Sequence, residues 1–540
     1  MKKIILGNTR SVINETVSEF ENLVCATMGP YGQTIAFQNE IGVPVITKDG
    51  VSVAKAIEFD KPEKNLIAKI LKQAAEKTND EAGDGTTTST AIASATVREG
   101  NKALAAGNDV NSLRRGINQS LEKVLARLDQ QRVDFSDKTE NEKAEILTKI
   151  AMISTNGDHK ISELIASAVA KAGRSGVVNV QKGALDFSLV QSTGMKIPNA
   201  SFTDYEFVRG SAEKKVILKK CRILITTYDL ESANVIRALD DKVLTPIMNA
   251  GETLLVMPRK ADKGFLANMI NNNAKGYLRN VVVKAPYFGA VGREMMDDVA
   301  AMTGATVIDE REGHKLQNIQ LSNLGYAEEV EVNAHSTILF QPKKDEARVA
   351  KRIKILEDKA KAIDYKRGDA DKTLERLAAI TGSVYNVKIP SFSEVEDKEI
   401  MDRVEDAINA CKGALEFGYL PGGGMALLKI AHEISSESSY SAILCNIISY
   451  PFKRILDNAG KNHELISNQL MQAQNDYVYD AREGKFGEAL ELGIIDSYKV
   501  VTKSLTNGIS VGLMLLTTVG LIADLPEQGP IPFEWDPSMS

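Results

Sequence analysis

The order of sequence patterns along the chain limits its fold more than any single motif does. Apolar residues recur at helical spacing over residues 10–28 and 64–130, and helical spacing returns beyond residue 400. Between about 190 and 384 the pattern changes to short apolar strands that alternate with helices. Such a change indicates an α/β unit inserted into a helical one, so the first and last thirds of the chain should build one helical domain together.

Several short apolar runs predict strands. In the middle segment the predicted strands are 222–226, 253–257, 280–284 and 305–308. In the first third, 34–37 and 43–46 predict a hairpin, and a hairpin isolated among helices has an unpaired edge that usually needs covering. Residues 3–6 or the end of the chain, supplied by another subunit, are candidates for the covering strand. The sequence therefore predicts self-assembly.

Size and composition narrow the class of protein. A chain of 540 residues is too long for one core, which predicts three or four domains. The apolar and charged fractions are 43% and 26%, as in ordinary globular proteins, and a net charge of −6 argues against nucleic-acid binding. The four cysteines lie far apart without C-x-x-C spacing, which indicates neither zinc nor a disulfide framework and fits a reducing, cytoplasmic compartment.

Residues 504–523 form the one stretch whose length suggests a membrane span, because they include no charged residue. However, hydroxyl, amide and glycine residues dilute the stretch, and its ends lack aromatic anchors. A buried helix is the better interpretation. The apolar stretch near the N-terminus is far too short for a signal peptide and predicts a short strand instead.

The run from Gly83 to Thr88 is the strongest local motif. It places one carboxylate, Asp84, between two glycines and ahead of three threonines. Glycines let backbone N–H groups turn toward an anion, and hydroxyls add donors where a helix begins. Mg²⁺ prefers one or two carboxylates together with water and phosphate oxygens, which suits Asp84. An Asp-Gly turn before a Thr-capped helix explains these six residues about equally well.

Other glycine loops favour the phosphate interpretation. They comprise residues 27–32, the turn at Lys48, Asp49 and Gly50, and residues 422–424. Distributed loops of this kind suit one bound nucleotide. The chain has no G-x-x-x-x-G-K-[ST] string and no G-x-G-x-x-G between a strand and a helix, which excludes the P-loop and Rossmann fingerprints. The loops therefore indicate another class of ATPase.

Taken in order, these motifs resemble those of the group I chaperonins, the 60 kDa family of ring-forming, ATP-dependent folding machines. The likeness covers nearly the full length. It rests on TMGP from Thr27, TKDGVSV from Thr47, AGDGTTT from Ala82, VKAPYFG from Val283, RVEDA from Arg403 and GGG from Gly422.

The resemblance implies a multidomain α and α/β chaperonin fold. Its parts are a mainly helical equatorial ATPase domain, a small intermediate domain and an inserted α/β apical domain. The expected boundaries are 1–132 (equatorial, first part), 133–191 (intermediate, first part), 192–384 (apical, client-binding), 385–416 (intermediate, second part), 417–526 (equatorial, second part) and 527–540 (a flexible C-terminal tail).

The resemblance also implies a nucleotide site. It places around the phosphates Thr27, Met28, Gly29, Pro30, Lys48, Gly50, Gly85, Thr86, Thr87 and Thr88, with Asp84 on Mg²⁺. It places Gly423 and Asp496 at the ribose, Ile494, Asp480 and Ala481 at the base, and Ile153 among the cofactor-binding residues. The family usually has Asn at the position of Asp480. Because an Asp carboxylate cannot donate to the purine ring, we expect altered nucleotide preference or affinity.

Hydrolysis of ATP is mostly a matter of positioning, with one group that orients the attacking water. The resemblance assigns this catalytic role to Asp49 and Asp406. It places Asp406 on a helix of the intermediate domain, so Asp406 is expected to reach the site only after that domain swings down. Without the resemblance, Asp406 would be interpreted as a solvated helix carboxylate in an acidic stretch.

Client binding in this family uses an apolar groove between two helices and a nearby loop. The equivalent residues here are Val243, Leu244, Ile247, Leu266, Met269 and Ile270, with Phe202 and Tyr205 on the loop. Exposed apolar strips mark interaction sites, but for about half of these residues a place in the domain core is an equal alternative. Ser201, Glu206, Asp241 and Asn271 stand where the family tends to have apolar residues, which predicts a narrower client range.

Other departures are typical of a divergent member, such as a viral or paralogous one. Lys461 and Asn462 replace acidic residues at the usual contact between rings, so a single ring is an alternative to a double one. The resemblance implies identical subunits in a ring, heptameric by family, with no nucleic-acid or membrane partner; a co-chaperonin lid is left open. Its cofactors would be ATP and Mg²⁺, and it allows K⁺ as a second cation.

The function implied is that of an ATP-dependent chaperone. Apical grooves would bind non-native proteins, a cavity would promote their folding, and hydrolysis of Mg-ATP would time the cycle. The alternative is a ring-forming holdase or assembly scaffold with little refolding activity. A small-molecule kinase that uses the same loops is disfavoured, because no acceptor pocket or arginine cluster accompanies them.

Overall fold

The structure of the chain is a computed structural model, and the chain forms two compact units. The structure describes residues 2–5, 9–38, 42, 44–173, 176–184, 186–211, 214–231, 239–287, 289–362, 373, 376–377, 379–381, 383–390, 394–473 and 476–524. The helical unit comprises Met1–Ala170, Lys182–Ser188 and Lys388–Ser540, and the inserted unit comprises Lys171–Gln181 and Leu189–Val387. The two ends of the chain therefore do build one unit around an insertion, as the sequence patterns predict.

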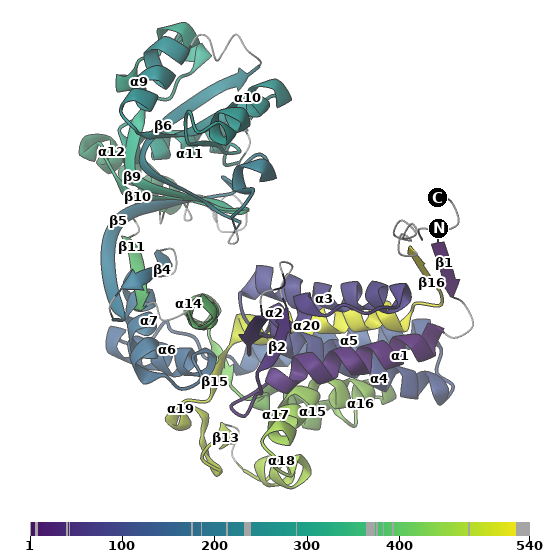
Figure 1. The fold of residues 1–540 in the computed structure, drawn as a ribbon. Coiled ribbons are helices and arrows are strands. Elements are labelled where there is room, and N and C mark those ends of the chain that lie inside the picture. The colour runs from purple at the N-terminus through teal and green to yellow at the C-terminus, as the bar shows by residue number, and fades with distance from the viewer. Residues whose placement is uncertain are drawn as a thin grey trace, which may run out of the picture. The chain divides into compact units, whose positions relative to one another are not determined.

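Long helices that lie side by side form the centre of the helical unit (Figure 1). They are α1 (Thr9–Val24), α3 (Pro62–Ala82), α4 (Thr86–Ala105), α5 (Val110–Gln131) and α20 (Tyr498–Leu516). Apolar residues at helical spacing, such as Ile67, Leu71 and Ile92, are fully buried between them. The glycine loops lie at the ends of helices of this unit, so the bundle holds them in place.

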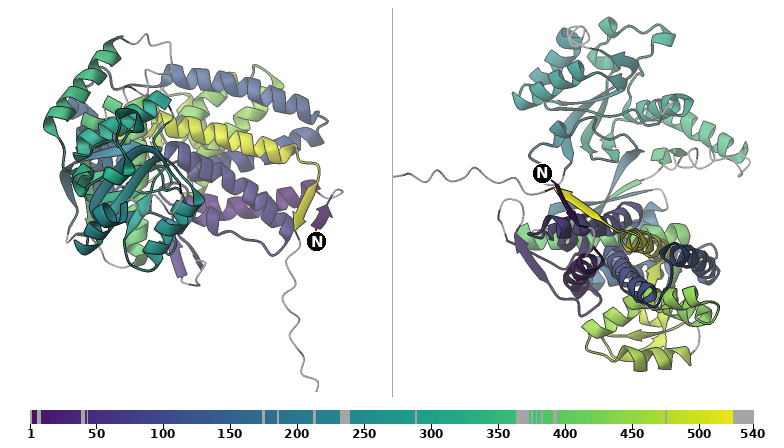
Figure 2. Two further views of the ribbon diagram at one scale, coloured as in Figure 1. Left: turned by 90° about the horizontal axis from the view of Figure 1, so that it is seen from above. Right: turned by 90° about the vertical axis from the view of Figure 1, so that its right-hand side faces the viewer.

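Helix α20 packs closely against α4, and Figure 2 shows it among helices from the first part of the chain. Gly508 and Gly512 make this approach possible. A Cβ atom on Gly508 would lie 2.6 Å from the carbonyl oxygen of Ser89, and one on Gly512 would lie 2.5 Å from Cβ of Thr96. The uncharged stretch 504–523 is thus mainly a buried helix, and within the described residues no helix has the length and apolar character of a membrane span.

Shorter elements complete the helical unit. They are η1 (Cys25–Thr27), α2 (Gly50–Ala56), α6 (Glu140–Ser154), α7 (His159–Ala172), α14 (Glu394–Phe417), β12 (Tyr419–Pro421), α15 (Met425–Ile434), α16 (Ser439–Ile448), α17 (Tyr450–Asn458), α18 (His463–Met471), β13 (Tyr477–Asp480), β14 (Lys485–Glu488), α19 (Ala489–Leu492) and β15 (Ile495–Ser497). The four cysteines are free and buried.

Two small antiparallel sheets have open edges. The predicted hairpin is present as β2 (Ile35–Gln38) and β3 (Pro44–Thr47). The N-terminal strand β1 (Lys2–Ile5) pairs with β16 (Leu521–Asp524) near the other end of the chain. Within the described residues each of these sheets has two strands, as the β12–β15 and β13–β14 pairs also do, so each has edges with unpaired backbone groups.

The inserted unit is built on an eight-stranded sheet with the order β4-β11-β5-β10-β9-β6-β7-β8. Strands β6, β7 and β8 are parallel to one another, and β9 and β10 run antiparallel to their neighbours. The strands are β4 (Val177–Ala184), β5 (Ser188–Pro198), β6 (Val216–Leu230), β7 (Thr253–Ala261), β8 (Asn280–Val282), β9 (Gly325–Val332), β10 (Ser336–Pro342) and β11 (Ser383–Pro390). The helical segments are η2 (Tyr205–Val208), η3 (Asp240–Leu244), α9 (Thr245–Asn249), α10 (Lys263–Ala274), α11 (Gly289–Thr303) and α12 (Glu346–Ala362), with short turns η4 (Glu310–Glu312), η5 (Leu316–Asn318) and η6 (Leu321–Asn323).

Three of the four strands predicted in this unit are present: 222–226 and 253–257 lie within β6 and β7, and β8 covers the first three residues of the predicted 280–284. The fourth prediction, 305–308, is wrong. Only Ile308 bridges to Thr226 there, because α11 runs to Thr303, Gly304 turns with a φ of 73°, and η4 begins at Glu310. The apolar residues of this short connection pack into the core without pairing as a β-strand.

Candidate functional site

Asp84 lies in the sharp turn between the end of α3 and the start of α4. Gly83 ends α3 with a φ of 70°, and its N–H donates to the carbonyl oxygen of Asn79 at 2.8 Å. Gly85 precedes α4 with a φ of 83°. Both values are in the left-handed region, which glycine adopts without strain. The glycines on either side of Asp84 are therefore required by the turn that exposes its carboxylate between two helix ends.

Two hydrogen bonds orient the carboxylate of Asp84. Its Oδ1 accepts from the backbone N–H of Gly85, and its Oδ2 accepts from Oγ of Ser154 at 3.0 Å. Burial raises the pKa of Asp84, and the charge of Asp49 adds to the increase, while the two hydrogen bonds oppose it. Ser154 is the last residue of α6 and was not among the residues identified from sequence, although it directly follows Ile153.

Asp49 begins helix α2 as its N-cap. Oδ1 accepts from the N–H of Val51 at 3.1 Å and Oδ2 accepts from that of Ser52 at 2.7 Å, so both carboxylate oxygens are held by backbone. The next residue, Gly50, packs on α4, because a Cβ atom there would lie 2.1 Å from Oγ1 of Thr87. The turn at Asp49 and the threonine run, separated in sequence, are in contact in the structure.

Asp406, on α14, lies within electrostatic range of both carboxylates. Burial raises the pKa of Asp406 well above its usual value, and the charges of Asp84 and Asp49 raise it further. The sequence-based expectation was that Asp406 reaches the site only after a domain movement. In this structure α14 belongs to the helical unit and packs against α20 and β15, and the charges of Asp84 and Asp49 act on Asp406 without such a movement.

Asn409 supports the same turn from α14. Its Nδ2 donates to the carbonyl oxygen of Gly83 at 3.4 Å, and a Cβ atom on Gly83 would lie 2.4 Å from that nitrogen. Asn409 was missed from sequence. The available signal was its spacing of three residues from Asp406, which places both side chains on one face of a helix.

The glycine run 422–424 and Asp496 form a second part of the site. The N–H of Gly422 donates to the carbonyl oxygen of Ile494 at 2.8 Å, and β12 pairs with β15 directly before it. Asp496 accepts a hydrogen bond from the N–H of Gly423, which has a φ of 63°. Burial, reinforced by the charge of Asp84, raises the pKa of Asp496 to about 7. The structure therefore brings together Gly423, Asp496 and Ile494, and it places Asp496 within electrostatic range of Asp84.

The loop 27–32 is tightly folded at the end of η1. Oγ1 of Thr27 donates to the carbonyl oxygen of Val24 at 2.8 Å, so this hydroxyl is engaged within the chain. Met28 is buried against Ala91 of α4, whereas Gly29 and Pro30 are exposed. Nδ2 of Asn458, on α17, donates to the carbonyl oxygens of Cys25 and Met28, both at 2.9 Å. Asn458 therefore fixes the loop from outside it and was also missed from sequence.

The two remaining residues predicted at the base, Asp480 and Ala481, lie at the end of β13 and directly after it, and Ile153, predicted as a cofactor-binding residue, lies near the end of α6. Oδ1 of Asp480 accepts from the N–H groups of Arg482 and Glu483 at 2.8 and 3.1 Å, so one of its oxygens stabilises its own turn. Ala481 is buried, and Ile153 is 41% exposed. Nη2 of Arg482 donates to the carbonyl oxygen of Asn156 at 3.1 Å, which connects this turn with the end of α6.

The charges at Asp84, Asp49 and Asp406 fit a magnesium nucleotide. The charge of Asp49 raises the pKa of Asp84, and the charges of both raise the pKa of Asp406, so the three groups repel; a divalent cation relieves that repulsion. Among the residues described, no three His, Cys, Asp or Glu side chains are grouped closely enough to hold a metal by themselves. A cation here would depend on water and phosphate oxygens, which is the usual coordination of Mg²⁺.

A model of the TCP-1/cpn60 chaperonin family matches residues 20–525. The chain belongs to this family. The chaperonin gp146 from the bacteriophage EL 2 (Pseudomonas aeruginosa), crystallised in the presence of ATP-BeFx, has a similar structure at 22% sequence identity. Crystal form II gives a TM-score of 0.71 over 96% of this chain and 98% of gp146, and form I gives 0.65 over 97% and 99%. Family and fold therefore agree with the resemblance seen in the motifs.

In this chaperonin most of the apolar residues expected to bind clients are in the core. The buried ones are Val243, Leu244, Ile247, Met269 and Phe202, each at most 4% exposed. Leu266 and Ile270 are half-buried, and Tyr205 is 68% exposed. The first four pack with Phe265 and strand residues beneath α9 and α10, because the short α9 and the first turns of α10 cover one face of the sheet. Core packing, the alternative open at the sequence level, therefore describes five of the eight.

Proposed function

We propose that this chaperonin binds ATP with Mg²⁺ at the loops around Asp84 and hydrolyses it to drive a protein-folding cycle. The observation that carries the proposal is the position of Asp406 within electrostatic range of Asp84 and Asp49. Three carboxylates, from α14, the α3–α4 turn and the start of α2, repel one another and do not stabilise the fold by being near each other. A bound cation and phosphate chain would explain why they are within electrostatic range.

Each carboxylate has a distinct role in this proposal. Asp84, oriented by Ser154 and Gly85, would hold Mg²⁺, which supplies charge neutralisation at the phosphates. Asp49 cannot move freely, because two backbone N–H groups hold it, and it fixes one side of the attacking water. Asp406 has a raised pKa, as suits a group that orients the water and accepts its proton. Glycine loops and the N-terminus of α4 would surround the phosphates.

We propose that ring assembly uses the two small sheets. The β2–β3 hairpin and the β1–β16 pair each have open edges, and Ile46 and Ile522 are exposed on them by 52% and 59%. We infer that the hairpin of one subunit pairs with the β1–β16 pair of its neighbour, which covers both. Sevenfold symmetry remains the expectation from the family. Tyr205, Leu266 and Ile270 are the predicted client-binding residues with accessible surface on the inserted unit.

ATP turnover with Asp406→Asn tests the proposal. The substitution keeps the shape of the side chain and removes its charge, so we expect turnover to fall on the order of 100-fold while nucleotide binding persists. Glu405→Gln is the matched control, because Glu405 is exposed beside Asp406 on the same helix. Equal turnover by wild type and Asp406→Asn would overturn the catalytic assignment. A wild-type chain that binds clients without any turnover would favour the holdase or scaffold.

A further inference from the structure

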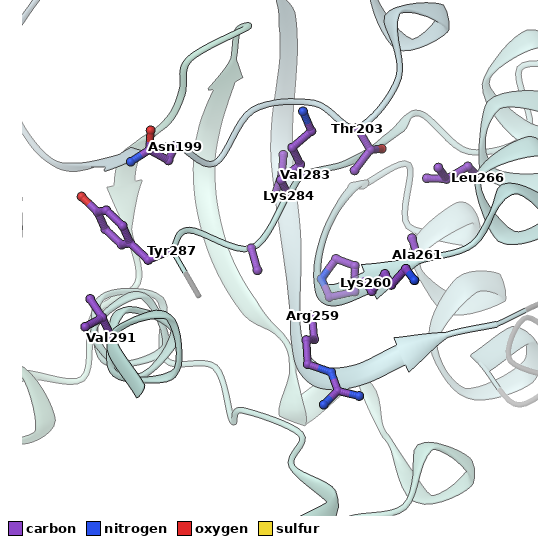
Figure 3. A pocket seen from close by; sticks show the side chains of 12 residues that line it. Asn199, Thr203, Arg259, Lys260, Ala261, Leu266, Val283, Lys284, Tyr287 and Val291 are labelled. Carbon is purple, nitrogen blue, oxygen red and sulfur yellow. The ribbon is translucent and has the colours of Figure 1, made fainter. Parts of the chain in front are cut away.

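A cavity of about 700 Å³ lies in the inserted unit, and Figure 3 shows Leu266 on one side of it and Tyr287 on the other. Because Leu266 is among the residues predicted to bind clients, this cavity adjoins the surface proposed for clients, and we assign it no separate role. The helical unit has a feature of a different kind, a single arginine that contacts two segments of the proposed nucleotide site.

This arginine, Arg482, lies in the turn between β13 and β14, beside the residues predicted at the base. Asp480 shapes the turn, since its Oδ1 accepts from the backbone N–H groups of Arg482 and Glu483. Oη of Tyr31, in the loop 27–32, donates to the carbonyl oxygen of Arg482 over a long 3.5 Å. The backbone of Arg482 is thus placed by its own turn and by the loop predicted at the phosphates.

The side chain of Arg482 reaches the segment that follows α6. Its Nη2 donates to the carbonyl oxygen of Asn156 at 3.1 Å. Its Nη1 lies over Gly157, where a Cβ atom would be 2.2 Å away, so a residue with a side chain would displace the guanidinium. Among the described residues no carboxylate forms an ion pair with Arg482. The guanidinium therefore joins the β13–β14 turn to the end of α6.

Hydrogen bonds make the end of α6 a stiff link between this contact and the proposed metal ligand. The N–H groups of Asn156 and Gly157 donate back to carbonyl oxygens in the last turn of α6, at 3.3 and 2.8 Å, and both residues have a positive φ. This pair of bonds is a Schellman motif, which closes a helix with a defined geometry. Ser154 lies inside the motif, and its hydroxyl donates to Oδ2 of Asp84. A displacement of Asn156 would therefore move the hydroxyl that orients Asp84.

We propose that Arg482 is a positioning residue for the magnesium ligand, because it holds the end of α6 where Ser154 orients Asp84. This inference rests on the proposed function, in which Asp84 binds Mg²⁺. Arg482 would touch neither the metal nor the phosphates. Arginine suits the role, since its planar guanidinium can donate to a carbonyl oxygen while it lies flat against a glycine. Groups that orient a metal ligand affect the affinity for the metal.

Binding of a fluorescent ATP analogue to the full chain, followed while Mg²⁺ is titrated, tests this proposal without requiring turnover. Arg482→Ala removes a charged donor from an exposed hydrogen bond, so it should raise the Mg²⁺ concentration for half-maximal binding by about threefold to tenfold. Arg482→Lys keeps a donor for the carbonyl oxygen of Asn156 and should recover much of that loss. The matched control is Lys485→Ala, which removes an equal charge from an exposed position on β14 of the same hairpin and should leave the titration unchanged.

A double-mutant cycle with Ser154→Ala separates positioning from a general loss of stability. Because Arg482 acts through Ser154, Arg482→Ala should shift the titration by less than about twofold when Ser154→Ala is already present. Affinity for the analogue without Mg²⁺ should be the same in the wild type and in Arg482→Ala. Three results would overturn the proposal: equal shifts in the two backgrounds, an equal loss of affinity with and without Mg²⁺, or an Arg482→Ala titration that overlays the wild type.

Failure of the proposed function would give a different result. A wild-type chain whose binding of the analogue does not depend on Mg²⁺ would contradict the assignment of Asp84 to the metal, and the role of Arg482 with it. Binding that depends on Mg²⁺ in the wild type, together with an unchanged titration in Arg482→Ala, would contradict the role of Arg482 alone.

Discussion

The hydroxyl of Ser154 donates a hydrogen bond of 3.0 Å to Oδ2 of Asp84, although 70 residues separate them in the chain. This bond joins the end of α6 to the turn between α3 and α4. It orients the carboxylate that we assign to Mg²⁺ without contributing a ligand itself. Residues that orient a metal ligand in this way affect affinity as well as geometry.

Ser154→Ala should weaken the dependence of ATP turnover on Mg²⁺ without abolishing it. The loss of one hydrogen bond to a charged group is worth about 1.5 to 3 kcal/mol, which corresponds to a rise of about tenfold or more in the Mg²⁺ concentration needed for half-maximal turnover. A magnesium titration measures this. Ser435→Ala removes a hydroxyl that bonds only to an exposed carbonyl oxygen, and it should not change the titration. A Ser154→Ala titration that overlays the wild type would show that Ser154 does not position Asp84.

Asp496→Asn should stabilise the protein in the absence of nucleotide and Mg²⁺ at neutral and alkaline pH. The pKa of Asp496 is raised to about 7 in the folded state, whereas an unfolded Asp titrates near 3.9. The unfolded chain therefore loses this proton first as pH rises, so Asp496 reduces stability progressively between those values and by a constant amount above them. Because each pKa unit corresponds to about 1.4 kcal/mol, removal of the charge should recover up to about 4 kcal/mol at pH above 7 and nothing below the unfolded pKa.

Thermal unfolding across that pH range measures the effect. The difference in stability between Asp496→Asn and the wild type should grow from acidic to neutral pH and then level off. Asp129→Asn removes a carboxylate with an exposed side chain, paired with Arg132, whose charge stays constant over this range, and should show no such growth. A difference that stays constant with pH would contradict the raised pKa.

Gly508→Ala should destabilise the helical unit, although alanine is the better helix former. The added Cβ atom would lie 2.6 Å from the carbonyl oxygen of Ser89 and 2.9 Å from Cβ of Ile92, so α20 and α4 must move apart. Overpacking of this kind costs about 1–3 kcal/mol. Chemical denaturation measures the loss, with Met514→Ala on the exposed side of α20 as a nearly neutral reference. An unchanged or higher stability in Gly508→Ala would show that the two helices are not closely packed.

Ile46→Asp should prevent assembly of the ring. Ile46 is an exposed apolar residue of the β2–β3 hairpin, and a carboxylate there would be buried without a partner if a neighbouring subunit covers the sheet. Mass photometry should show free subunits in place of rings. Val519→Ser, which changes a residue 79% exposed outside any strand, should assemble normally. Intact rings in Ile46→Asp would place the subunit contact elsewhere.

Sequence patterns predicted the fold class and much of the candidate site, because glycines at Gly83 and Gly85 and the carboxylates of Asp84, Asp49 and Asp406 occur in specific motifs. Ser154, Asn409 and Asn458 were not predicted, since each acts through a contact between segments far apart in the chain, which no local pattern encodes. For the same reason periodicity did not separate exposed from buried residues: Val243 and Ile247 have the apolar character of a binding strip but pack into the core. The electrostatic influence of Asp84 and Asp49 on Asp406 likewise depends on tertiary packing.

If hydrolysis at Asp406 drives the folding of bound clients, ATP-dependent refolding of an aggregation-prone protein should depend on this residue. Wild type and Asp406→Ala would be compared, each alone and with a co-chaperonin. We expect recovery of active client by the wild type in at least one condition and loss of that recovery in Asp406→Ala, with the client still bound. Equal recovery by both proteins, or no recovery by the wild type under either condition, would contradict this expectation.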